Sequence, residues 1–250
     1  MLGPAGVQLH FADLQDGIVD LSDTTPPATI RRSVGILARM AQLLELPVIL
    51  SAAPRPGGPA VVEEAAVPQA PVFVRDGPCA WDDTPTRRAL TAQPRKHLAL
   101  CGVTSEIVVL HTALDALAAG YEVSVLLDAC GGLSSRTEQA AFRQIELAGG
   151  RVIGVAGFAT DLVRDFTTPV GREVITALHG LVQEPVVEGA RYPLDRDRRV
   201  VDYSGPPVAS HRGQRHGSAV GVRGCGSPGA ATTSRTGPHS PTLRPCASTR

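Results

Sequence analysis

The chain has 250 residues, 43% of them hydrophobic, and no formal net charge, so it is long enough to bury a substantial core. The zero net charge gives no argument for a nucleic-acid or anionic-membrane partner, and no apolar run approaches the roughly 18 residues of a transmembrane helix. Five widely spaced cysteines without zinc-ligand spacing fit a reduced compartment better than a disulfide framework. With no secretory signal at the N-terminus, we expect a cytoplasmic protein.

Short apolar runs alternate with helical patterns from the N-terminus to about residue 183. The expected strands are Val7–Leu14, Pro47–Ser51, Pro71–Arg75, His97–Cys101, Glu122–Leu127 and Arg151–Val155. The expected helices are Pro26–Leu46, Thr84–Ala92, Ser105–Ala119, a helix from Ser135 to the Gly149-Gly150 pair, and Gly171–Val182. Strand–helix alternation with continuous apolar strands predicts a three-layer α/β/α doubly wound fold of about six parallel strands in the order 3-2-1-4-5-6.

Three helix starts carry recognisable signals. Thr25 precedes Pro26, and Thr84 precedes Pro85, so each threonine is a candidate N-cap before a proline that the first turn tolerates. Ser135-Arg136-Thr137-Glu138 has the spacing of a capping box.

The C-terminal part of the chain differs in composition from the rest. From Tyr203 to Arg250 it has no acidic residue and no lysine, and it is rich in Gly, Ser, Pro, Thr and Arg. Such a composition buries too little apolar surface to offset the entropy of ordering. We therefore expect a folded domain at 1–185 and an irregular, disordered tail at 186–250. The tail arginines are spaced singly, without aromatic interleaving, which argues against a nucleic-acid partner.

The topology places a pocket between the first and fourth strands, beyond their carboxyl ends, where the strand order reverses. Asp13 ends the first strand, and the fourth ends in a glycine turn followed by Thr104 and Ser105 at a helix N-terminus. A part-buried aspartate tends to have a raised pKa and is a candidate general acid or base. A structural capping aspartate is the competing interpretation.

Residues 97–130 and the segment FADLQDGIV resemble the isochorismatase-like cysteine hydrolases. In that family the turn reads Gly-Val-x-Thr-(Asn/Glu)-x-Cys-Val, and the cysteine is the nucleophile. Here the run is Gly102-Val103-Thr104-Ser105-Glu106-Ile107-Val108-Val109, so Val108 stands where the nucleophile would be. The resemblance implies the same fold, a catalytic acid at Asp13, and a cis peptide near Val103–Thr104.

Other positions acquire roles by the same resemblance. Arg75 stands where the family has a catalytic lysine, and the alternative is a structural partner of Asp13. Trp81, in a Cys-Ala-Trp-Asp-Asp block, is a candidate pocket wall or an ordinary packing residue. With Gln15, Thr104, Ser105 and Val108, it completes the predicted substrate-binding set. Ser51-Ala52-Ala53 replaces the metal-binding motif of the nicotinamidases, so no metal is implied. No nucleotide motif is present, and we expect no cofactor.

Two functions are compatible with these residues. One is a hydrolase that acts without a thiol on a small carboxylate-bearing substrate, as the isochorismate-cleaving members do with their aspartate as acid. The other is a catalytically degenerate member that binds a small molecule or serves as an oligomer scaffold. Rescue of the nucleophile by Cys79, Cys101 or Cys130 and a catalytic His111–Asp115 pair are weaker alternatives. The family usually forms dimers or larger rings, so we expect a homo-oligomer.

Overall fold

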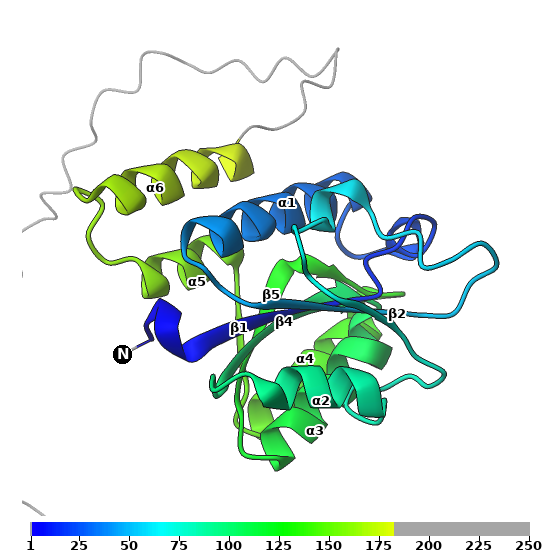
Figure 1. Ribbon diagram of the computed structural model, residues 1–250. Helices are drawn as coiled ribbons and strands as arrows, with labels where there is room; N and C mark the ends of the chain where they lie inside the picture. Colours follow the sequence, from blue (N-terminus) through cyan, green and yellow to red (C-terminus); the bar gives the residue numbers. More distant parts are fainter. Residues whose placement is uncertain (1, 183–250) are drawn as a thin grey trace, which may run out of the picture. The chain divides into compact units, whose positions relative to one another are not determined.

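A computed structural model describes residues 2–182, which form a six-stranded sheet with helices on both faces (Figure 1). The strand order is β3-β2-β1-β4-β5-β6, and every neighbouring pair is parallel. The predicted doubly wound α/β fold and its strand order are confirmed. The predicted tail at 186–250 lies outside the described residues.

The strands run over β1 Val7–Ala12, β2 Val48–Ala52, β3 Val72–Val74, β4 His97–Val103, β5 Glu122–Gly131 and β6 Arg151–Ile153. Every residue of β1, β2 and β4 is buried, as expected for strands covered on both faces. The edge strand β3 is exposed at Val72 and Val74. The central strands therefore form a rigid, buried framework that positions the residues at their carboxyl ends.

The helices cover the two faces of the sheet in two groups. Helices α1 (Pro27–Leu43), α5 (Val155–Leu162) and α6 (Pro169–Val182) lie on one face (Figure 1). Helices α2 (Thr84–Ala92), α3 (Leu110–Ala118) and α4 (Ser135–Leu147) lie on the other. The short turns are η1 (Pro4–Gly6), η2 (Val19–Leu21), η3 (Glu63–Ala65) and the π-helical η4 (Ser105–Val109). No helix of the described residues is long and apolar enough to cross a membrane.

The expected helix caps were each wrong by one residue. Asp83, not Thr84, caps α2, and its Oδ2 accepts a hydrogen bond from the backbone N–H of Thr86. Ser134 caps α4, with its Oγ accepting from the Thr137 N–H. In each case the neighbouring polar residue offers the same chemistry, so sequence alone did not separate the two.

Two further corrections concern these helix starts. The Glu138 carboxylate does not close a capping box but accepts a hydrogen bond from the Ser105 hydroxyl instead. At α1 the N-cap is Pro26, without a side-chain hydrogen bond, so Thr25 is not the cap.

Helix α5 was not predicted, because residues up to Val155 were assigned to the sixth strand. The strand ends at Ile153, and Gly154 becomes the N-cap of a short helix. Asp128 in β5 accepts a hydrogen bond from the Val155 N–H at 2.7 Å, which fixes the first turn of α5. A tertiary contact of this kind leaves no signal in the local sequence.

Candidate functional site

Asp13 follows β1 directly and is held in a left-handed backbone conformation, with φ 53°. Its N–H donates to the Ser51 carbonyl of β2, and its carbonyl accepts from the Gln15 N–H, so the chain turns sharply at the carboxyl edge. The residue is 7% exposed. Burial raises the pKa of the Asp13 carboxyl, and the nearby Arg75 guanidinium opposes this only in part.

Arg75 follows β3 and reaches across the end of β2 to the Asp13 carboxylate. Its N–H donates to Ala52, its Nη2 donates to Asp13 Oδ2 in an ion pair, and its Nη1 donates to the Gly77 carbonyl. The residue is 3% exposed. The carboxyl ends of β1 and β3 thus bring an acid and a guanidinium into direct contact beside the switch point.

Two polar atoms of this pair have no partner. Asp13 Oδ1 and Arg75 Nε are both buried and make no hydrogen bond within the described residues. Buried polar atoms are almost always hydrogen-bonded, to protein or to an ordered molecule. The ion pair thus leaves one acceptor oxygen and one N–H donor of these two side chains unsatisfied.

His10 lies in β1 beside the pair and was not singled out from the sequence. Its Nε2 lies 2.9 Å from Ser51 Oγ, and its Nδ1 is buried without a partner. Complete burial, followed by the charge of Arg75, lowers the pKa of His10 to about 3. The imidazole is therefore neutral at ordinary pH. Polar residues at alternate positions of a doubly buried strand, Gln8 and His10, were the signal that could have revealed it.

The residues after β4 form the other side of the switch point. Ala12 lies opposite Gly102 in the β1–β4 register, so Asp13 and the Val103–Thr104 turn leave neighbouring strands together. The Val103–Thr104 peptide is cis, as the resemblance implied. Ser105 is fully buried and donates to Glu138 Oε1 at 2.7 Å, whereas Thr104 is only partly buried.

Val108 lies in η4 and is 1% exposed. An isopropyl group therefore fills the space where the resemblance would place a sulfur. The preceding Glu106 was also not predicted to matter. Its Oε1 accepts hydrogen bonds from the Leu133 N–H and the Thr137 hydroxyl, which tie the start of α4 to η4.

Gln15 is fully buried and braces the loop beyond β2. Its Oε1 accepts from the Ala53 N–H at 2.8 Å, and its Nε2 donates to the carbonyls of Ala53 and Pro59. The amide is therefore engaged on both sides by backbone groups of this chain.

Trp81 contacts α3 and the residue before β5. The Ala80 N–H donates to the Thr112 hydroxyl of α3. The Trp81 ring packs edge-on against Tyr121, with ring centroids 5.1 Å apart. Tyr121 precedes the amino-terminal end of β5, whereas Asp13 follows the carboxyl end of β1.

The three cysteines of the described residues are free and buried. Burial raises the pKa of the Cys79 thiol to about 11 and also raises the pKa values of Cys101 and Cys130. A nucleophilic thiol needs the opposite shift. Cys79, Asp82 and Asp115 place one ligand atom each within 4.8 Å of one another, but the Cys79 thiol donates a hydrogen bond to Asp115 Oδ2. The described cysteines thus have the character of structural thiols.

Taken together, the fold and this edge define an α/β protein with a buried carboxylate–guanidinium pair at its switch point, where none of the three described cysteines has the character of a nucleophile. The model of the isochorismatase domain matches residues 11–157, more than half of the chain. The chain belongs to the isochorismatase family.

Relatives support this assignment over most of the described residues. The chain is 32% identical to the probable hydrolase YcaC of Escherichia coli over 164 residues, covering 64% of this chain and 79% of that protein. It is 31% identical to isochorismatase domain-containing protein 2 of Bos taurus, covering 78% and 92%. The structure of YcaC from Pseudomonas aeruginosa, with hexane-2,5-diol and covalent acrylamide, superposes with a TM-score of 0.68 at 28% identity, covering 72% and 91%.

Proposed function

We propose that the chain is a hydrolase that acts without a thiol on a small carboxylate-bearing substrate, with Asp13 as the acid/base. The observation that carries this is the pair of unpartnered buried atoms, Asp13 Oδ1 and Arg75 Nε. The Arg75 N–H binds an oxygen of the substrate carboxylate, since arginine keeps its charge at any working pH. Arg75 does not exchange protons, which leaves that role to Asp13.

The raised pKa of Asp13 suits this role. A carboxyl whose ionised form is disfavoured by burial gives up a proton to a substrate oxygen or carbon and later accepts one from the attacking water. His10 remains neutral below the pair and adds no second charge. Gln15 holds the loop at Ala53 in place and so acts as a positioning residue. The partly buried Thr104 and the turn amides line the other strand end and contribute donors for the substrate.

The test is hydrolysis by the full chain of a panel of small esters and enol ethers that carry a carboxylate. Asp13→Asn removes the titratable group while keeping the shape, so we expect the rate to fall by at least about a hundredfold. Asp23→Asn, an exposed aspartate beyond the same strand end, is the matched control and leaves the rate unchanged. Iodoacetamide treatment leaves the activity intact. Activity that survives Asp13→Asn, or that iodoacetamide abolishes, contradicts the proposal.

A second candidate is a family member that binds small carboxylates without turning them over. It is favoured by the closure of the site, because Asp13, Arg75 and Val108 are all less than a tenth exposed. In that case calorimetry detects binding of pyruvate that Asp13→Asn weakens, while no member of the panel is hydrolysed. This outcome separates the two candidates directly.

We further propose that the chain forms a homo-oligomer. YcaC of Escherichia coli, which superposes with a TM-score of 0.64 at 30% identity and covers 72% of this chain and 88% of that one, is described as an octameric hydrolase of unknown specificity. The exposed valines of the edge strand, Val72 at 40% and Val74 at 50%, are surface that an assembly would cover. Light scattering on the purified chain that gives a monomer mass at micromolar concentration contradicts this.

A further inference from the structure

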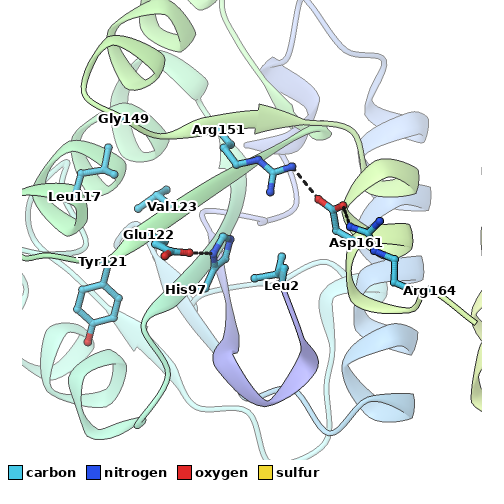
Figure 2. A pocket seen from close by; sticks show the side chains of 10 residues that line it. All are labelled: Leu2, His97, Leu117, Tyr121, Glu122, Val123, Gly149, Arg151, Asp161 and Arg164. Atoms are coloured by element: carbon cyan, nitrogen blue, oxygen red, sulfur yellow. Dashed lines mark hydrogen bonds and ion pairs between the residues drawn. The ribbon is translucent and has the colours of Figure 1, made fainter.

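A cavity lies at the amino-terminal edge of the sheet, opposite the edge that carries the Asp13–Arg75 pair. It has a volume of 570 Å³ and is lined by residues from the amino-terminal ends of β4, β5 and β6, together with the end of α5 and the segment after it (Figure 2). Cavities of this size hold small organic molecules. Neither the resemblance nor the relatives assign a role to this edge.

One wall of the cavity is a three-membered ionic cluster. Arg151 Nη2 lies 2.8 Å from Asp161 Oδ2, and Arg164 Nη2 lies 2.9 Å from Asp161 Oδ1 (Figure 2). The hydrogen bond from Arg151, followed by smaller charge effects, lowers the pKa of Asp161, so the carboxylate is ionised. Two guanidiniums share one carboxylate, and the cluster has a net charge of one positive unit.

The two guanidiniums have N–H groups that make no hydrogen bond within the described residues. Across the described residues each makes a single hydrogen bond, to Asp161, so the other N–H groups of its planar fork remain available. Arg151 is 50% and Arg164 62% exposed at the side chain, which leaves both accessible to a ligand. Planar guanidinium groups match the geometry of a carboxylate.

The side facing the cluster is mixed. Leu117 and Val123 lie across the cavity from Asp161 and Arg164, with Leu2 below and the Glu122 carboxylate next to Val123 (Figure 2). Glu122 Oε2 lies 3.0 Å from His97 Nδ1, and the His97 Nε2 lies 2.9 Å from Ser124 Oγ. Both ring nitrogens of His97 are therefore engaged, and the N–H donors without partners among the described residues of this cavity are those of the two guanidiniums.

We propose that this cavity binds a small organic monoanion, a carboxylate attached to an apolar body. The carboxylate accepts hydrogen bonds from Arg151 and Arg164, and the apolar body packs against Leu117 and Val123.

The test is isothermal titration of the full chain with benzoate, an anion with an apolar ring, and with benzamide, its uncharged counterpart. We expect saturable benzoate binding and at least about tenfold weaker benzamide binding, because hydrogen bonds between ionised partners are the stronger class. Arg151→Gln and Arg164→Gln should each weaken benzoate binding about tenfold. Arg143→Gln, an exposed arginine of α4, makes the same charge change away from the cavity and is the control.

Two further measurements make the result unambiguous. Asp13→Asn should leave benzoate binding at this cavity unchanged, which separates it from the proposed site at the other edge. Thermal melts without ligand confirm that the half-exposed arginine variants fold. The absence of saturable benzoate binding, equal binding of benzamide, or equal effects of the Arg143 and Arg164 variants overturns the proposal.

Discussion

Protonation of His10 gives a stability prediction whose size follows from its burial. In the native state burial and the Arg75 charge hold the pKa of His10 at about 3, against an ordinary value of 6.5. Between these two pH values the unfolded chain binds a proton at His10 that the native chain does not bind. The free energy of unfolding therefore falls as the pH falls. The slope is about 1.4 kcal/mol per pH unit, or roughly 2 kcal/mol between pH 6.5 and pH 5.

Urea unfolding at several pH values between 7.5 and 5 measures this directly. His10→Gln removes the titration, and its amide can still bond to the Ser51 hydroxyl seen at 2.9 Å from His10 Nε2. The difference in unfolding free energy between wild type and variant should fall by roughly 2 kcal/mol from pH 6.5 to pH 5. His111→Gln, at an exposed position of α3, is the control. Parallel curves for wild type and His10→Gln would refute the reasoning.

Three further substitutions test particular contacts. Gly102→Ala places a Cβ 2.0 Å from the Ala12 carbonyl oxygen at a residue with φ 156°, so we expect the free energy of unfolding to fall by about 3 kcal/mol or more. Gly77→Ala is the control, because its Cβ would meet nothing within 4 Å, and it should cost less than about 0.5 kcal/mol. Equal melting temperatures for these two would contradict the packing of β1 on β4. Arg75→Met leaves Asp13 buried without a counter-charge and should destabilise the fold by roughly 3 kcal/mol near neutral pH, less in acid where Asp13 is protonated. A cost that does not shrink in acid would contradict the ion pair. Val108→Ala removes two buried methyl groups and should cost about 1.6 kcal/mol in chemical denaturation; no loss would mean that the side chain is not packed.

The fold could be predicted because its strands are continuous apolar runs, which only a sheet covered on both faces buries. The strand ends could not. β1 was expected to reach Leu14 but ends at Ala12, because Asp13 adopts a positive φ. β5 was expected to end at Leu127 but continues to Gly131, because after extra residues of β5 between Val125 and Cys130 the pairing resumes between Gly102 and Cys130. Both depend on contacts between strands.

The candidate site was partly predictable from the order of the strands. The reversal of strand order locates the carboxyl edge, and Asp13, Arg75 and Thr104 all follow strands that end there. Trp81 follows no strand directly, and its position depends on contacts with α3 and Tyr121 that leave no signal in the local sequence. His10 was overlooked because a buried neutral histidine resembles its apolar neighbours in a strand.

We propose that the Asp13–Arg75 pair is a ligand site although Val108 occupies the nucleophile position. A crystal structure of the chain soaked with pyruvate is the test. We expect a pyruvate oxygen within hydrogen-bond distance of both Asp13 Oδ1 and Arg75 Nε, the two atoms left without partners. Pyruvate bound elsewhere, with those two atoms satisfied by other groups of the protein, would contradict it.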